Sequence, residues 1–199
     1  MMKSQLFGYI LMAFVIAVCI KMFIDSDYYN LSCIVSTVDG NKYCVRVKDD
    51  LKHQETVDLL AKVTNKCKKI VSYMGSNYGN RENVKKLVKN FNPRKVKEIL
   101  PTSEFTAYSE NKGEKLAFCT TTQKNGGSLI DENTLTFVAL HELSHIMTKS
   151  IGHTDEFWNN FKFVLECAKK SGLYNPVDYK KNPQTYCGMK ITDNPYYDL

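Results

Sequence analysis

An apolar run near the N-terminus constrains this chain most, because such a segment has to fold apart from the rest. Residues 6–20 are all apolar or aromatic except for Gly8, and after Lys21 three more apolar residues follow, Met22, Phe23 and Ile24. About 19 residues of this kind approach the ~20 that a helix needs to cross a bilayer. The run has no polar face, which argues against a helix in the core of a soluble domain.

We expect this segment to make the chain a single-pass membrane protein. The anchor should occupy residues 1–24 and contact the lipid bilayer through residues 6–24. A cleaved signal peptide is the other interpretation, although no A-x-A-like cleavage site follows the run. The charges that flank the run slightly favour an internal N-terminus and a translocated domain.

Residues 25–199 have the composition of one globular domain. The whole chain is 43% hydrophobic and 12% aromatic, and its net charge of +6 is compatible with an anionic partner without being diagnostic of one. None of the seven cysteines forms a C-x-x-C pair, which argues against a zinc ribbon or a thioredoxin-like site. The six cysteines outside the anchor could form three disulfides or remain buried thiols.

Local patterns predict hairpins and helices in the first half of this domain. Residues 32–47 should form a β-hairpin that turns at Asp39-Gly40, which would place Cys33 and Cys44 diagonally across it. An amphipathic helix should run from about Asp50 to Tyr73 and be broken by residues 75–80. A second hairpin should span Thr106 to Cys119.

Residues 81–98 are rich in lysine and arginine. A stretch of this kind could contact nucleic acid or anionic lipid. Few aromatic residues lie between the basic ones, so a solvated helical face is the favoured interpretation and nucleic acid the disfavoured one.

The segment His141-Glu142-Leu143-Ser144-His145 carries the chemistry. The helix around it, from about Glu132 to Ser150 with Asp131 as its N-cap, is apolar nearly all round and should be the buried central helix of the domain. On a helix, an H-E-x-x-H segment places two imidazoles about 6 Å apart on one face, where they can share a Zn²⁺ ion. Glu142 is rotated by about 100° from its neighbour, which puts its carboxylate beside the metal as a candidate catalytic base.

A catalytic zinc site needs a third protein ligand and an open position. Gly152 should end the helix at its C′ position and turn the chain back, so that His153 reaches the metal. Glu166, on a helix expected over Glu156–Lys170, is the rival third ligand. Hydrogen-bonded core histidines without any metal are the remaining interpretation.

At these residues the chain resembles the WLM group of zinc metallopeptidases and their SprT-like relatives. The resemblance rests on residues 136–145 and on Gly152-His153-Thr154-Asp155-Glu156-Phe157-Trp158, and it is specific over roughly residues 116–162. It implies an α+β zincin-like domain with a small antiparallel sheet, a zinc ion bound by His141, His145 and His153, and Glu142 as the catalytic residue. A short anchor followed by such a domain is also similar to metallopeptidases encoded by large DNA viruses.

The expected activity is therefore hydrolysis of a protein or peptide substrate, with Glu142 as general base for a zinc-activated water. The strand Lys115–Cys119 should pair with an extended substrate, and Tyr174, Tyr179 and Tyr186 are candidates to stabilise the oxyanion. The alternative is a membrane-anchored structural or interaction protein whose zinc site is not catalytic.

Overall fold

The structure is a computed structural model that describes residues 2–46 and 50–198. Its helices are α1 (Met2–Ile24), α2 (Asp27–Asn30), α3 (Asp50–Tyr78), α4 (Glu82–Asn90), α5 (Glu132–Met147), α6 (Asp155–Lys170) and the 3₁₀ turn η1 (Pro195–Tyr197). Its strands are β1 (Leu31–Val35), β2 (Lys42–Arg46), β3 (Val96–Glu98), β4 (Ala107–Glu110), β5 (Lys115–Phe118), β6 (Thr121–Gln123), β7 (Gly126–Leu129), β8 (Gln184–Tyr186) and β9 (Met189–Ile191). The fold is mixed α+β, as the sequence predicts.

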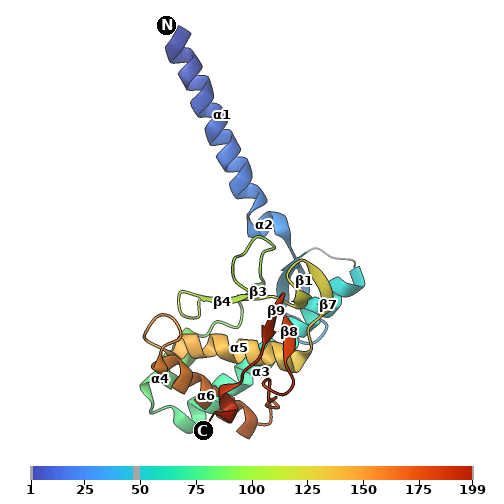
Figure 1. The fold of residues 1–199 in the computed structure, drawn as a ribbon, viewed down its shortest axis with the longest axis vertical. Helices are drawn as coiled ribbons and strands as arrows, with labels where there is room; N and C mark the ends of the chain where they lie inside the picture. Colours follow the sequence, from blue (N-terminus) through green and yellow to red (C-terminus); the bar gives the residue numbers. More distant parts are fainter. Residues whose placement is uncertain (1, 47–49, 199) are drawn as a thin grey trace.

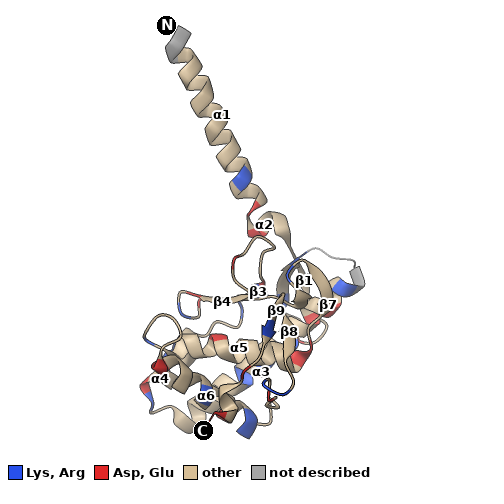
Figure 2. Cartoon of the chain, viewed as in Figure 1, with Lys and Arg blue, Asp and Glu red and all other residues tan. Residues whose placement is uncertain are grey.

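Helix α1 stands apart from the rest of the molecule (Figure 1). Its segment Gln5–Ile24 has a mean hydropathy of 2.4 and no buried residue, so by length and composition it could cross a membrane. Within that segment Lys21 is the one charged residue, and it lies near the end that joins the domain (Figure 2). The buried hydrophobic cluster begins at Tyr43 and takes nothing from α1. The described hydrophobic core is therefore built from residues that follow α1 in the sequence.

The main sheet has five strands in the order β1-β2-β3-β5-β4. Strands β1 and β2 are antiparallel, as are β4 and β5, but β3 runs parallel to both β2 and β5. The expectation of an antiparallel sheet is therefore wrong for its centre. The reason is that α3 and α4 lie between β2 and β3 and carry the chain back to the start of the sheet, a crossover that parallel pairing requires.

Helices α3 and α5 pack against the sheet and against each other, and α4 and α6 pack on α5. The long helix continues to Tyr78, five residues beyond the predicted end at Tyr73, and stops within the predicted break at residues 75–80. A Cβ atom at position 75 would lie 3.2 Å from Cγ2 of Val88. Gly75 therefore serves the close approach of α4 to α3 rather than a turn.

The first hairpin is in a different register from the predicted one. Cys33 lies directly opposite Cys44, and the two form a disulfide. The turn spans residues 36–41, where the amide of Ser36 donates to the carbonyl of Asn41 at 2.9 Å, so its centre precedes Asp39-Gly40. A second disulfide joins Cys119 to Cys187, whereas Cys67 and Cys167 remain buried thiols. Both of the alternatives for the six cysteines are thus realised in part.

The basic stretch 81–98 is helical only as far as Asn90 and then enters β3. Helix α4 is amphipathic, with Val84 and Leu87 buried. Some of the cations have partners within the chain, since Lys97 pairs with Asp27 and Lys86 donates to the carbonyl of Thr148. Acidic and basic residues are interspersed over the domain (Figure 2).

Candidate metal centre

Helix α5 brings three of the candidate residues to one cleft. The carboxylate of Asp131 accepts a hydrogen bond from the amide of Thr134 at 2.9 Å, which confirms the predicted N-cap. The helix ends at Met147, three residues before the predicted Ser150, because the backbone of Thr148 is extended, with φ −79° and ψ 137°. Most of α5 is buried, so its position relative to the sheet is fixed by core packing.

The chain returns from α5 to α6 through residues 148–154. Gly152 has a φ of +83°, a conformation that favours glycine, but it lies in this connection and is not the C′ residue of α5. The prediction that Gly152 ends the helix is wrong, but the predicted return of the chain toward the histidines of α5 is found. His153 lies against the two histidines of α5.

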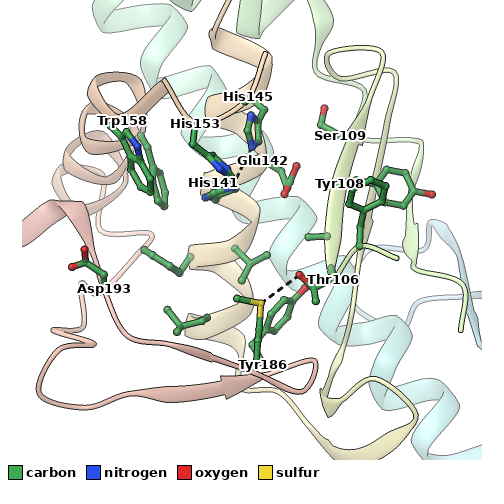
Figure 3. A pocket seen from close by; sticks show the side chains of 18 of the residues that line it. Thr106, Tyr108, Ser109, His141, Glu142, His145, His153, Trp158, Tyr186 and Asp193 are labelled. Carbon is green, nitrogen blue, oxygen red and sulfur yellow. Dashed lines mark hydrogen bonds between the residues drawn. The ribbon is translucent and has the colours of Figure 1, made fainter. Parts of the chain in front are cut away.

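The three imidazoles form a nearly regular triangle, with ring centroids 4.9, 4.9 and 5.0 Å apart. Nε2 of His141 is 3.2 Å from Nε2 of His145 and 3.0 Å from Nε2 of His153. Figure 3 shows the three side chains pointing toward one another at the edge of the cleft. Among the residues that the structure describes, these three make up the one group with the spacing of a metal site.

These distances can be tested against the geometry of a metal ion. Two ligand atoms at 2.0–2.1 Å from a tetrahedral zinc ion lie about 3.3 Å apart. The two Nε2 separations at His141 come close to that value. A neutral imidazole nitrogen has one proton or one lone pair, so Nε2 of His141 cannot make full hydrogen bonds to both neighbours. A shared cation satisfies all three nitrogens, and the set fits zinc or a similar borderline metal.

Burial lowers the pKa of two of these histidines below the neutral range. The pKa of His141 is lowered to about 3, mainly by burial and then by the neighbouring His145 and His153. The pKa of His145 is lowered to about 4, again mainly by burial. The ring of Phe157 supplies much of that apolar surrounding, with centroid distances of 4.8, 4.3 and 4.7 Å to the rings of the three histidines. The site is therefore arranged to present neutral imidazoles, which is the form that binds metal.

Glu142 lies beside the triangle without belonging to it. Its carboxylate points away from the three rings toward β4 (Figure 3). The residue is 4% exposed, and burial raises the pKa of the carboxyl to about 8. A carboxyl in this position can accept or release a proton near neutral pH, which is what general acid–base chemistry requires.

The cleft has a volume of about 1190 Å³ and two unlike walls. One wall is β4, which is an edge strand of the main sheet. The other is largely apolar and combines α5 and α6 with the C-terminal segment; its side chains are Phe137, Val138, Trp158, Phe161, Ile191 and Pro195. Trp158 and Asp193 lie on the side of the histidines opposite to Ser109 and Tyr108 (Figure 3).

Glu166, the rival third ligand, is outside this site. It follows Phe157 by nine residues, which on a helix is a rotation of about 180°, so it lies on the far face of α6. Among the described residues it belongs neither to the metal-like cluster nor to the lining of the cleft. The fourth histidine, His53, is buried on α3 and is not part of the cluster either.

The three tyrosine candidates differ in position. Tyr174 and Tyr179 are buried in the packing around Phe137 and do not line the cleft. Tyr186 does line it, but its hydroxyl donates to the carbonyl of Thr106 at 3.0 Å and accepts from the amide of Cys119 at 3.1 Å. The hydroxyl proton of Tyr186 is thus already used in a hydrogen bond within the protein.

Sequence reasoning missed two features of the site. The C-terminal segment, including Ile191 and Pro195, forms part of the cleft wall, and no sequence motif indicates this. The connection that carries His153 is held by Lys112 and Glu156, which are separated from each other by 44 positions. Glu156 lies in the segment of residues 152–158, which resembles the metallopeptidases, but nothing in the sequence connects Glu156 with Lys112.

Comparison with known proteins places the chain among viral sequences. It is 26% identical over 176 residues to "Uncharacterized protein R325" of Acanthamoeba polyphaga mimivirus, with 86% of this chain and 83% of the relative aligned. It is 36% identical over 83 residues to "Uncharacterized protein 042R" of Invertebrate iridescent virus 3 and 34% identical over 82 residues to "Uncharacterized protein 136R" of Invertebrate iridescent virus 6. These two alignments cover 42% and 41% of this chain and 50% and 44% of the relatives. No model of a known protein family matches the sequence, and no solved structure matches the chain. The relatives support a viral protein.

Proposed function

We propose that the chain is a membrane-anchored zinc metallopeptidase with a zincin-like domain. One observation carries the proposal, namely that His141, His145 and His153 converge at the spacing of zinc ligands beside the buried carboxyl of Glu142. Three protein ligands leave a position for solvent, whereas structural zinc sites usually close with a fourth protein ligand. The resemblance of residues 136–158 to WLM and SprT-like metallopeptidases agrees with this assignment.

Each residue then has a chemical role. When bound, zinc lowers the pKa of a water molecule toward ~7 and polarises the carbonyl of the scissile bond. The carboxylate of Glu142 would accept a proton from the attacking water and pass it to the departing amine. The buried surroundings of Glu142 suit both steps, since they bring the pKa of its carboxyl close to neutral.

The cleft suits an extended peptide. Strand β5 is covered on both sides by β3 and β4, so the earlier expectation that Lys115–Cys119 pairs with substrate is wrong. Of the two edge strands, β4 lines the cleft and can offer backbone groups to a substrate strand. The apolar wall opposite, with Phe161 and Trp158, can accept a bulky apolar side chain of that substrate.

The decisive variant is Glu142→Gln in a chain that begins at residue 25. It should retain one zinc ion per chain, because no ligand is removed, and lose hydrolysis of unfolded protein or of a diverse peptide library. Glu166→Gln on the far face of α6 is the matched control and should keep both properties. Turnover by Glu142→Gln equal to that of the wild type would refute the assigned role. Zinc binding without any wild-type hydrolysis would favour the non-catalytic alternative.

The anchor and the disulfides together suggest on which side of the membrane the domain lies. Disulfides persist in oxidising compartments, and the structure forms two, at Cys33–Cys44 and Cys119–Cys187. We therefore place the domain on the oxidising side and the N-terminus on the other, in agreement with the flanking charges. Digestion of sealed membranes from outside tests this, because a lumenal domain should resist added protease until detergent is present.

A further inference from the structure

His153, the proposed third metal ligand, lies in a segment whose side chains make few packing contacts. We call residues 148–153 the return loop, since they lead from α5 back to α6 and carry His153. Ile151 is 91% exposed, and no atom lies within 4 Å of where a Cβ of Gly152 would be. His153 itself is exposed, so burial alone does not fix its position. Its placement depends on what holds the start of the loop.

Two lysines bind the carbonyl groups at this start. Nζ of Lys112 donates to the backbone carbonyls of Ser150 at 2.8 Å, Thr148 at 3.1 Å and His145 at 3.4 Å. Nζ of Lys86, on α4, donates to the carbonyl of Thr148 at 2.6 Å. The last carbonyls of a helix have no partner within it and carry partial negative charge, so cations at this end are stabilising.

A carboxylate binds the amide groups of the same segment. The side chain of Glu156, in the first turn of α6, accepts from the amide of Lys149 at 2.9 Å and from that of Ser150 at 3.2 Å. It also accepts from the Ser150 hydroxyl at 2.9 Å. Hydrogen bonds to a charged acceptor are among the stronger ones in proteins. Ser150 is thus held from both sides, by a cation on its carbonyl and an anion on its amide.

We call the hydrogen bonds of Lys112 and Glu156 to this segment the clamp. The clamp is connected to two of the proposed metal ligands. Only Ile151 and Gly152 separate Ser150 from His153, so fixing Ser150 limits where the His153 ring can lie. Lys112 also contacts the backbone of His145, which ties the second ligand to the same group. Lys112 lies in the tight β4–β5 turn, where Asn111, Lys112 and Gly113 have φ values of 47°, 56° and 114°. The side chain of Lys112 thus starts from this turn and reaches the carbonyl groups of the return loop.

We infer that Lys112 and Glu156 are positioning residues that set the metal affinity of the site by clamping the return loop. The inference rests on the proposed zinc site. Both residues act through hydrogen bonds to the chain around the site: Lys112 binds the carbonyls of His145, Thr148 and Ser150, and Glu156 binds Lys149 and Ser150. Removing either should leave all three ligands present but let His153 move away, which weakens zinc binding by roughly 10–100-fold, as for other groups that orient metal ligands.

The test uses the full chain in detergent micelles, stripped of metal and titrated with Zn²⁺ against a chromophoric chelator. Lys112→Met and Glu156→Gln should both raise the dissociation constant, and Lys112→Arg, which keeps a cation with several donors, should restore part of the affinity. Lys115→Met is the matched control, because Lys115 lies in the same hairpin but pairs with Glu110 at 2.9 Å. Unfolding temperatures of the metal-free proteins are measured alongside.

A second readout does not need zinc. Hydrogen exchange at the amides of Lys149 and Ser150 in the metal-free chain should become faster in Lys112→Met and Glu156→Gln and stay unchanged in Lys115→Met. Affinities within twofold of the wild type would overturn the inference, as would an equal loss in Lys115→Met. A wild-type chain that binds no zinc would instead refute the proposed function, and the exchange rates would still decide whether the clamp holds the loop.

Discussion

Replacement of Glu142 by glutamine should change how the stability of the metal-free protein depends on pH. The carboxyl is 4% exposed, and burial raises its pKa from 4.5 to about 8. Between these values the folded protein keeps a proton that the unfolded chain has released. The contribution of Glu142 to the free energy of unfolding should therefore be highest below about pH 4.5 and fall as pH rises through about 8. Glutamine does not titrate, so the variant lacks this loss.

The size of the effect follows from the two pKa values. At about 1.36 kcal/mol for each pH unit, the full loss above pH 8 is about 5 kcal/mol, and the loss at pH 7 is about 3 kcal/mol. A buried amide without partners has its own cost of about 1–3 kcal/mol, but that cost does not depend on pH. The pH dependence of the difference between wild type and variant is thus the quantity to measure.

Urea unfolding of both proteins with intact disulfides, from about pH 5 to about pH 8, provides that quantity. The histidines titrate in both proteins and largely cancel in the difference, which should grow by about 3–4 kcal/mol in favour of the variant. Saturating zinc should make this difference nearly independent of pH, because a nearby divalent cation favours the carboxylate form of Glu142. Parallel profiles of the two metal-free proteins would refute the reasoning that Glu142 is buried without compensation.

Three further predictions concern packing, covalent structure and substrate preference. Phe157→Ala should lower the free energy of unfolding by about 3–5 kcal/mol, since the side chain is fully buried, whereas Phe157→Leu should cost clearly less in the same urea assay; equal costs would contradict the described packing. Cys187→Ser should cost about 4 kcal/mol, because the lost disulfide closes a loop with a sequence separation of 68, and peptide mapping of the oxidised wild type should recover the Cys119–Cys187 pair. Peptides with a phenylalanine or leucine next to the scissile bond should be cleaved with a kcat/KM at least ~10-fold higher than peptides with aspartate there, because the wall around Phe161 and Trp158 is apolar. Equal kcat/KM values would show that this wall has no role in substrate binding.

Elements with local signals can be predicted from the amino-acid sequence alone. The apolar run predicts α1, the Asp131 cap predicts the start of α5, and the pattern from Thr106 to Cys119 predicts the β4–β5 hairpin. Helical spacing also puts His141 and His145 on one face, and the glycine before His153 suggests a route back to them. Each of these inferences depends on residues within one or two turns of one another, where backbone geometry is fixed by the sequence.

Features that depend on contacts between distant segments become visible in the folded domain. The parallel pairing of β3, the helical role of Gly75 and the pairing of Cys119 with Cys187 each join residues that no local pattern connects. The same holds for the identity of the exposed edge strand and for the clamp on the return loop. Whether His153 or Glu166 lies beside His141 and His145 depends on the rotation of α6 about its axis. That rotation is set by burial of Phe157 and Phe161 against α5, which turns Glu166 away. Packing of a helix face against a core is a property of the whole domain, which is why the sequence could propose the ligands but not bring them together.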